Sequence, residues 1–285
     1  MIRKFIANMT PGPLKPMAKK IESMVYFTQT MGLSFDKWRR YLSLGGSEKY
    51  IYMQKTFYEK KAGNSKYCKT GIVDHVVGVY ALHNDWEDYD TYLMKYVDHS
   101  FLKKKALDFA CGPGRNIVKY NSRFAQVHGC DISAANIKNA RKLLIENNIP
   151  LPPLYITSGS DIGDVPDDYY DLIFSTIAMQ HICVYDIRLN ILKHMYKALK
   201  SGGRISVQMG FDPDPNFIKL GSAGYYENNY NALTTNSGHD CRIESPNQIK
   251  KDLVEKIGFK NFEYWVRPVG PGDNHQNWIF FTAIK

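Results

Sequence analysis

The stretch Ala106-Leu-Asp-Phe-Ala-Cys-Gly-Pro-Gly-Arg-Asn-Ile117 begins as a short apolar run, breaks at Gly112-Pro113-Gly114 and returns to a helix-compatible pattern at Ile117. This order predicts a strand, a tight turn and a helix, which together open a parallel α/β unit. Glycine tolerates positive φ and has no Cβ to keep the backbone away from a ligand. The amides that start the helix would face that ligand with the positive end of the helix dipole. Residues 110–115 are therefore predicted to hold a polar or anionic group.

The identity of that ligand depends on two positions. The dinucleotide fingerprint requires glycine at position 117, where this chain has Ile117. Asp108 ends the strand directly before the loop, and its carboxylate would repel a pyrophosphate but suit a cationic or amine-bearing ligand. The segment resembles motif I of the class I S-adenosylmethionine-dependent methyltransferases, hydrophobic-hydrophobic-Asp-x-x-Cys-Gly-x-Gly. The resemblance implies that the methionine end of the cofactor is held by Asp108, Ala110, Cys111, Gly112 and Gly114. Ala110 stands where the family more often has glycine.

Composition places the chain among ordinary globular proteins. It has 285 residues, of which 44% are hydrophobic and 23% charged, enough for one large domain or for one domain with an appended subdomain. The sequence contains no apolar stretch of about 20 residues, and its basic N-terminus is too interrupted for a signal peptide. The 5 cysteines are widely spaced and form no C-x-x-C pair. These features predict reduced thiols in a cytoplasmic protein, with neither a disulfide framework nor a metal site.

The formal net charge of +9 leaves several partners open. A basic balance suits a nucleic acid, an acidic membrane surface or an anionic substrate, or it reflects only a lysine-rich surface. The lysines are dispersed and no arginine-rich tract is present, which favours the last interpretation. Nucleic acid remains a possible partner without support from any motif.

Residues 1–105 do not follow the pattern of a parallel α/β unit. Apolar spacing predicts a helix over 19–41, broken near Gly32, and another over 50–58. His83 and Asp85 lie in a polar and aromatic stretch just ahead of the glycine loop. This stretch is either an amphipathic helical region or a lid over the substrate, because methyltransferases of this kind commonly cover the active site with N-terminal helices. The second interpretation makes His83 and Asp85 candidate bases.

The next predicted strand, 126–130, ends at Asp131. An acid at this strand end can accept hydrogen bonds from both ribose hydroxyls of a nucleoside. That role fits a nicotinamide cofactor and S-adenosylmethionine equally, with Ile132 beside it. Asp131 or Ser133 could also cap the helix predicted over 134–147, and the two roles are compatible.

A third strand, predicted over 154–157, precedes Ser160, Asp161 and Ile162. In the methyltransferase family an acid at this strand end bonds the adenine amino group, and a neighbouring apolar side chain lies against the ring. The resemblance therefore implies that these three residues contact the adenine. The alternative is an ordinary polar surface loop.

The fourth strand, ending at Ser175, is followed by Gln180 and His181. This segment resembles the family's motif IV, and strands one and four meet where open α/β sheets bind ligands. Ser175 and Gln180 are therefore candidate cofactor contacts. His181 could accept a proton from a substrate hydroxyl or could be a buried scaffold residue.

The remaining sequence continues the α/β pattern. Glycines 202 and 203 are expected to end the preceding helix, and residues 210–245 look like an insertion that carries substrate elements. A further helix, a sixth strand and an antiparallel last strand beside it complete the expectation; their ranges are 246–257, 261–266 and 278–284.

The sequence thus predicts an α/β, Rossmann-like, doubly wound sheet of seven strands, with a mainly helical extension over 1–105 and a cofactor domain over 106–285. The expected function is transfer of a methyl group from S-adenosylmethionine to a small molecule, chiefly to an oxygen of a sugar or metabolite. RNA methylation is the first alternative, because of the charge. A nicotinamide-dependent oxidoreductase and a non-catalytic nucleoside-binding module are the others. The acceptor and the oligomeric state are not indicated by the sequence.

Overall fold

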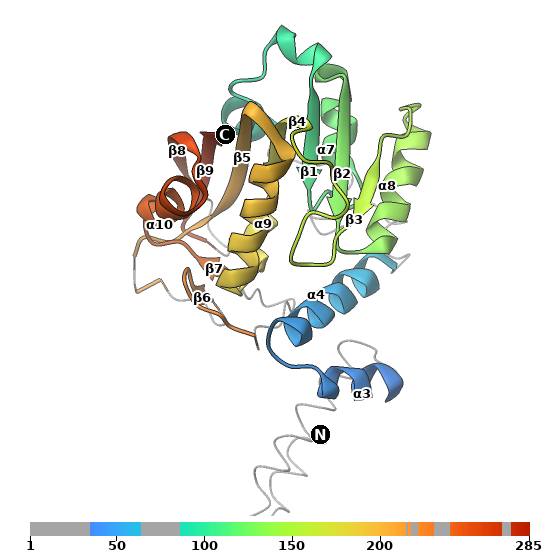
Figure 1. The fold of residues 1–285 in the computed structure, drawn as a ribbon, viewed down its shortest axis with the longest axis vertical. Coiled ribbons are helices and arrows are strands. Elements are labelled where there is room, and N and C mark those ends of the chain that lie inside the picture. The colour runs from blue at the N-terminus through green and yellow to red at the C-terminus, as the bar shows by residue number, and fades with distance from the viewer. Residues whose placement is uncertain (1–34, 64–85, 215, 218–221, 231–239, 270–274) are drawn as a thin grey trace, which may run out of the picture.

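The computed structural model describes residues 35–63, 86–214, 216–217, 222–230, 240–269 and 275–285 (Figure 1). Its centre is a seven-stranded sheet in the order β3-β2-β1-β4-β5-β9-β8. Strands β1 to β5 run parallel to one another, whereas β9 is antiparallel to both β5 and β8. The predicted sheet, with its antiparallel last strand inserted beside the sixth long strand, is confirmed. The strands are β1 Lys105–Phe109, β2 Gln126–Asp131, β3 Leu154–Ile156, β4 Tyr170–Ser175, β5 Leu199–Phe211, β8 Lys260–Pro268 and β9 Asn277–Ile284.

Helices cover both faces of this sheet. Ala106 and Leu107 are adjacent on β1 and both fully buried, yet they belong to separate hydrophobic clusters, because successive strand residues point to opposite faces. Helices pack against the sheet on both the Ala106 side and the Leu107 side, and each cluster includes residues of three of them. On the first face these are η3 Tyr89–Leu93, α7 Arg115–Tyr120 and α8 Ala134–Glu146; on the second they are α9 Tyr185–Ala198, α10 Pro246–Lys250 and η7 Lys251–Ile257.

Helix ends follow local sequence signals at most positions. The Ser133 hydroxyl caps α8 by accepting a hydrogen bond from the Asn136 amide. The α10 helix begins with Pro246 and carries a capping box between Ser245 and Gln248. Its π-helical continuation ends at Gly258, which adopts the left-handed conformation.

One predicted helix end is wrong. Glycines 202 and 203 do not cap α9, which ends at Ala198 with Leu199 already extended. They lie instead within β5, which begins at Leu199. A Cβ on Gly203 would stand 3.0 Å from the Tyr170 carbonyl oxygen of β4. Glycine is therefore needed there for the close approach of two strands, a requirement that resembles a helix stop when only the sequence is available.

Two segments outside the sheet lie at the carboxyl ends of its parallel strands. Helix α4, Gly46–Gly63, is preceded by α3, Phe35–Ser43, and Figure 1 shows α4 beneath the carboxyl ends of the parallel strands, next to α8. The predicted insertion contributes two short parallel strands, β6 Ala223–Gly224 and β7 Cys241–Arg242. Among the described residues, every helix is too short or too polar to cross a membrane.

Shorter elements complete the described chain. They are α6 Trp86–Asp88, η4 His99–Lys103, η5 Asn121–Arg123 and η6 Met179–His181.

Candidate functional site

A cavity opens at the carboxyl ends of β1, β2 and β4, the edge at which open α/β sheets bind ligands. Its walls come from the glycine loop, from the ends of β2, β3 and β4, and from α4. The lining residues are Tyr50, Ile51, Gln54, Tyr58, Phe109, Ala110, Cys111, Gly112, Arg115, Asn116, Asp131, Ile132, Asn136, Thr157, Gly159, Asp161, Thr176, Ile177, Ala178, His181, Ile182 and Ile191.

Asp108 lies behind the glycine loop and is fully buried. Its Oδ1 faces the Asn116 amide nitrogen at 3.4 Å, and the same amide also donates to the Thr176 hydroxyl at 3.1 Å. Oδ2 of Asp108 has no hydrogen-bond partner in the described part of the chain. Burial raises the pKa of Asp108 to about 8, because the charged form loses its hydration. A buried acid with an unpartnered oxygen suits a cationic ligand, which would favour the ionised form.

The loop itself depends on left-handed backbone. Gly112 and Gly114 have φ of +53° and +88°, and a Cβ on Gly114 would stand 3.1 Å from the Ala140 Cβ of α8. Ala110 also has a positive φ, +57°. Positive φ explains why glycine is common in this position of the motif, and alanine occupies it here at a cost of about 1–2 kcal/mol. The turn brings the loop amides close to the cavity.

Asp131 connects the glycine loop to the start of α8. Its Oδ2 accepts a hydrogen bond from the Gly112 amide at 2.9 Å. Its Oδ1 accepts from the Ser133 amide at 2.8 Å and from the Asn136 side chain at 3.2 Å. Burial raises the pKa of this carboxyl, although those donors oppose the shift. Of the two predicted capping residues, Ser133 is the one that caps α8. Asp131 accepts a hydrogen bond from the Ser133 amide and lines the cavity.

The loop after β3 forms a second polar wall. Asp161 accepts hydrogen bonds from the amides of Ser158 and Gly163, and from the Ser158 hydroxyl. Although burial acts in the opposite direction, these donors lower the pKa of Asp161. Its carboxylate is thus ionised and fixed at the cavity edge, with Thr157 beside it on the lining.

Helix α4 supplies a wall that sequence reasoning missed. Tyr50, Gln54 and Tyr58 recur every four residues and all line the cavity. The Tyr50 hydroxyl accepts a hydrogen bond from the Cys183 amide at 2.8 Å and donates to the His181 carbonyl oxygen at 2.9 Å. This four-residue spacing was the available signal, but it is equally typical of a helix that faces a core.

His181 lies on the cavity wall, at the end of η6, with a partly exposed side chain. Its Nδ1 is 2.5 Å from Oδ1 of Asp240, a residue that sequence analysis did not single out. An ionised carboxylate accepts only, so Nδ1 carries a proton, and in the neutral ring Nε2 carries the free lone pair. This arrangement can take a proton from a ligand in the cavity.

The structure brings together part of the predicted site. Cavity-lining positions are Ala110, Cys111, Gly112, Asp131, Ile132, Asp161 and His181. The other predicted cofactor contacts, Asp108, Gly114, Ser160, Ile162, Ser175 and Gln180, are not on the lining. Of these, Ser175 donates to the Phe109 carbonyl and Gln180 accepts from the Gly210 amide, so both act within the scaffold in this structure. His83 and Asp85 lie outside the described residues.

Comparison with protein families identifies the domain. The family model described as "Methyltransferase domain" matches residues 107–207, which include the glycine loop, Asp131, Asp161 and His181. The chain carries a class I S-adenosylmethionine-dependent methyltransferase domain.

Curated relatives of this methyltransferase agree with that assignment. The chain is 24% identical over 213 residues to the ubiquinone/menaquinone biosynthesis C-methyltransferase UbiE of Psychromonas ingrahamii, covering 70% of this chain and 81% of that protein. It is 27% identical over 220 residues to the UbiE of Methylococcus capsulatus, covering 68% and 84%.

A solved structure shares the fold of this methyltransferase. Phosphoethanolamine N-methyltransferase 2 of Haemonchus contortus, in complex with phosphomonomethylethanolamine and S-adenosylhomocysteine, superposes with a TM-score of 0.56 at 17% identity. The alignment covers 80% of this chain and 60% of that one. At this identity the likeness establishes the fold alone.

The residues of the methyltransferase fit its cofactor. S-adenosylmethionine carries a nucleoside, which suits the acids Asp131 and Asp161 on the cavity lining. It also carries an amino group and a sulfonium, whose positive charge suits the unpartnered oxygen of Asp108, a buried residue that is not itself on the lining. The nicotinamide alternative receives no support, because the matching family is a methyltransferase family and position 117 is a buried isoleucine.

Proposed function

We propose that this methyltransferase transfers the methyl group of S-adenosylmethionine to an oxygen of a small-molecule acceptor, with His181 as the general base. The supporting observation is the pair His181 and Asp240, in which a buried carboxylate orients an imidazole whose Nε2 is left for the acceptor. A base is needed when the acceptor is a neutral hydroxyl, because the oxygen is a weak nucleophile until it loses its proton.

The cofactor, when bound, supplies a methyl group already activated by a sulfonium. The chain therefore contributes binding, orientation and exclusion of water. In the proposal Asp131 accepts from the ribose and Asp161 from the adenine amino group, and Asp108 faces the cationic end of the cofactor. His181 Nε2 takes the acceptor's proton while Nδ1 stays bonded to Asp240.

The cavity walls near His181 favour a compact acceptor with apolar surface. Ile177, Ile182 and Tyr50 line that side, and Tyr58 adds a second aromatic ring from α4. A small alcohol or phenol would bury its carbon skeleton against these side chains and present its hydroxyl to the imidazole.

A ring carbon beside a phenolic hydroxyl is a second candidate acceptor. Both curated relatives are named as C-methyltransferases of ubiquinone/menaquinone biosynthesis. Ionisation of such a hydroxyl makes the adjacent ring carbon nucleophilic, so the same base would serve. Product analysis separates the two, because an ether and a ring methyl give different carbon shifts in NMR spectra.

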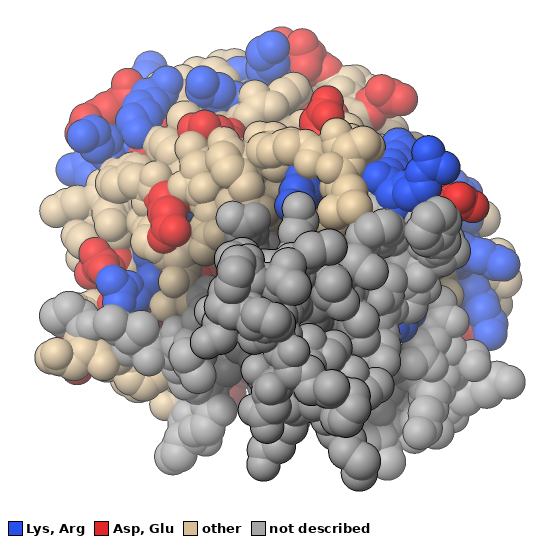
Figure 2. Space-filling model, turned by 90° about the horizontal axis from the view of Figure 1, so that it is seen from below, with Lys and Arg blue, Asp and Glu red and all other residues tan. Residues whose placement is uncertain are grey.

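RNA methylation has less support. Figure 2 shows Lys and Arg in separate groups with Asp and Glu beside them on the described part of the face seen from below. A nucleic-acid groove normally presents a continuous basic track. Weak binding to RNA, without steep salt dependence, is the expected result.

We also propose that the N-terminal extension acts as a lid on the cofactor domain. Its described helix α4 contributes four residues to the cavity wall and is bonded to the His181 segment through Tyr50. A ligand that lies beneath α4 needs this helix to move aside for entry or release.

Cofactor binding is the first test. Calorimetry with S-adenosylmethionine, S-adenosylhomocysteine and NADH should show binding of the first two only. Asp131→Ala should weaken binding of both by at least about tenfold. Asp164→Ala, an acid in the loop after β3 that does not line the cavity, is the matched control. Preference for NADH, or equal binding by both variants, would contradict the assigned cofactor site.

Methyl transfer is the second test. Wild-type protein is incubated with methyl-labelled S-adenosylmethionine and a panel of alcohols, phenols, amines and RNA. Transfer to a hydroxyl-bearing small molecule is expected, and His181→Gln should lower kcat by about 100-fold or more without changing cofactor affinity. Transfer confined to amines or RNA, or full activity of His181→Gln, would reject the proposal.

A further inference from the structure

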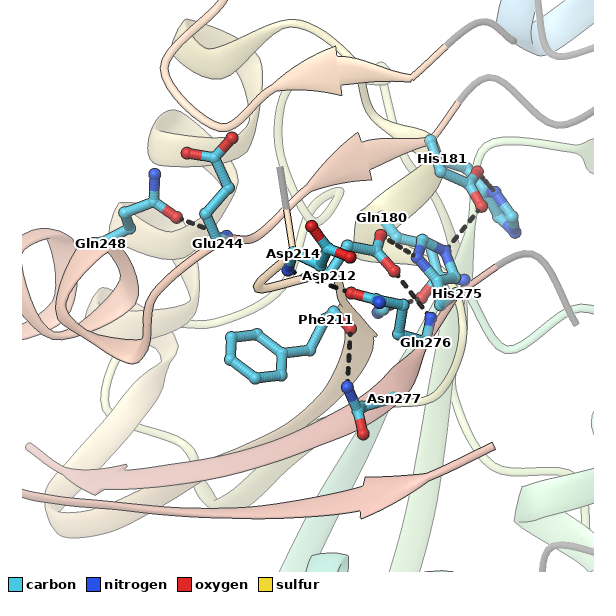
Figure 3. Close-up of polar contacts among 12 residues, drawn as sticks. Gln180, His181, Phe211, Asp212, Asp214, Glu244, Gln248, His275, Gln276 and Asn277 are labelled. Carbon is cyan, nitrogen blue, oxygen red and sulfur yellow. Dashed lines mark hydrogen bonds and ion pairs between the residues drawn. The ribbon is translucent and has the colours of Figure 1, made fainter. Parts of the chain in front are cut away.

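His275 lies between two carboxylates behind the cavity wall. Its Nδ1 is 2.8 Å from Oδ2 of Asp212, and its Nε2 is 3.0 Å from Oδ2 of Asp240. The imidazole is 4% exposed, and both acids are similarly buried. Figure 3 shows His275 between the Asp212 side of the cluster and His181. Neither Asp212 nor His275 lines the cavity.

The hydrogen bonds fix the charge of this cluster. Each ring nitrogen of His275 faces a carboxylate oxygen, and an ionised carboxylate only accepts, so the ring is doubly protonated. Burial alone would lower the pKa of His275, but the two carboxylates outweigh it and raise the pKa to about 9. Burial would likewise raise the pKa of Asp240, whereas His181 and His275 hold it below the ordinary value. At neutral pH a buried cation therefore keeps Asp240 ionised.

Asp240 divides its two oxygens between the two histidines. Oδ1 accepts from His181 and Oδ2 accepts from His275. With both oxygens occupied from opposite sides, the carboxylate cannot rotate without breaking a bond. His181 is thereby held in one tautomer and one orientation.

The backbone is shaped to admit the His275 ring. A Cβ on Gly210 would stand 2.1 Å from Cε1 of His275, so only glycine allows the imidazole to lie against the end of β5. The Gly210 amide donates to the Gln180 side chain, next to His181 in sequence. The cluster thus joins β5, the segment before β7 and the segment before β9.

We propose that Asp240 is a positioning residue for His181, and that His275 and Asp212 keep Asp240 ionised and oriented. This inference rests on the proposed function, in which His181 is the base. The acceptor's O–H bond breaks and its proton moves to His181 Nε2, while the oxygen–methyl bond forms as the cofactor's sulfur–methyl bond breaks. Asp240 stabilises the resulting imidazolium, which then releases its proton to solvent.

The tautomer of His181 gives a test that does not need an acceptor. Ring nitrogen shifts of ¹⁵N-histidine protein are recorded, and the His181 signals are assigned with His181→Gln. Wild type should show protonated Nδ1 and unprotonated Nε2. Asp240→Asn should change that tautomer, whereas Asp214→Asn, an exposed acid two residues beyond Asp212, should not. An Nε2-protonated ring in wild type, or no change in Asp240→Asn, overturns the proposal.

Gly210→Ala provides a variant that keeps every charge. The added methyl should displace His275 and disturb the His181 signals in the same direction as Asp240→Asn, but less. The folded state of each variant is checked by its amide spectrum. If Gly210→Ala is folded and leaves the His181 and His275 signals unchanged, the inferred geometry is wrong.

Acceptors of graded acidity separate positioning from a structural role. Asp240→Asn should lower kcat about 100-fold for a weakly acidic hydroxyl, with little change in KM, and the loss should shrink for acceptors that are already ionised. His275→Gln should give a smaller loss and Asp212→Asn the smallest. An equal loss for every acceptor would assign the cluster to folding only. Failure of wild type to methylate any hydroxyl would instead reject the proposed function, and the tautomer would still decide the positioning role.

Discussion

The Glu59 carboxylate of α4 accepts hydrogen bonds from the first two amides of α8, with 2.6 Å to Ala134 N and 3.2 Å to Ala135 N. These amides have no partner within their own helix, and an acid at this end also interacts favourably with the helix dipole. Asn139 of α8 further donates to the Ala62 carbonyl at the end of α4. The extension is therefore attached to the helix that follows Asp131, the last residue of β2.

Glu59→Gln should speed release of the cofactor. Replacing the charge weakens two charge-assisted hydrogen bonds, a loss of about 1–1.5 kcal/mol at a partly exposed site. If that energy holds the lid closed, the dissociation rate of S-adenosylmethionine rises about fivefold to tenfold. Stopped-flow displacement of the cofactor measures this rate. Glu48→Gln, an exposed acid at the other end of α4, is the control; equal rates for both variants would contradict the lid.

Cofactor affinity should increase with pH between about 6 and 8. The pKa of Asp108 is raised to about 8 by burial, so the free protein holds this carboxyl mostly protonated at neutral pH. A cationic ligand favours the ionised form, and binding at pH 7 should therefore release a proton. Calorimetry in two buffers of different ionisation enthalpy counts the protons. Asp108→Asn should bind more weakly and release fewer; an unchanged count would show that another group titrates.

The raised pKa of Asp108 should make the unfolding free energy fall with pH, whereas cofactor affinity should rise with pH. The folded protein keeps a proton on Asp108 up to pH of about 8, whereas the unfolded chain loses it near pH 4. The folded state therefore binds more protons between these values, and the contribution of this group to the unfolding free energy falls as pH rises. Urea unfolding should show a shallower fall in Asp108→Asn. A steeper fall in the variant would contradict the assigned pKa.

The parallel sheet and the glycine loop were predictable because their signals are local. A buried strand, a glycine pair and an acid at the strand end each occupy a few consecutive residues, as Asp108 to Gly114 do. Asp240 and His275 were not predictable, because they meet only after folding brings the end of β5 next to the segments that precede β7 and β9. Nothing near either residue in the sequence indicates the other.

The cavity wall formed by α4 was predictable only in part. The Tyr50 to Tyr58 stretch was predicted as a helix, and the structure extends it to Gly46–Gly63. Its contact with the cavity depends on tertiary packing against α8 and the His181 segment, which periodicity alone does not specify. The left-handed backbone of Ile177 was likewise not predictable, because nothing in the local sequence indicates it at a β-branched residue.

At position 177 a glycine variant should be more stable than an alanine variant, the reverse of the usual order of stability. Its φ is +50°, in the left-handed region, where a Cβ costs about 1–2 kcal/mol. Ile177→Gly should therefore be more stable than Ile177→Ala by about 1 kcal/mol in urea unfolding. At the next residue φ is −118°, so Ala178→Gly should lose about 0.5–1 kcal/mol. The strain assignment fails if alanine is the more stable residue at position 177.

Removing one hydroxyl from α4 should affect both stability and catalysis. The Tyr50 side chain is 1% exposed, and its hydroxyl connects the Cys183 amide with the His181 carbonyl. Tyr50→Phe leaves two buried backbone groups unpartnered and should cost about 1–3 kcal/mol of unfolding free energy. Because the lost bond holds the His181 backbone, kcat should also fall several-fold, whereas the dissociation constant of S-adenosylmethionine should change less.

Tyr52→Phe on the same helix is the matched control for Tyr50→Phe. The Tyr52 hydroxyl donates to the Lys37 carbonyl of α3 in an exposed setting, so its removal should change the unfolding free energy by less than about 0.5 kcal/mol. Equal losses in the two variants would mean that α4 is stabilised without any special link to His181. A loss of stability in Tyr50→Phe with unchanged kcat would show that Tyr50 does not affect the catalytic role of His181. The role of Tyr50 would then be confined to holding α4 against the domain.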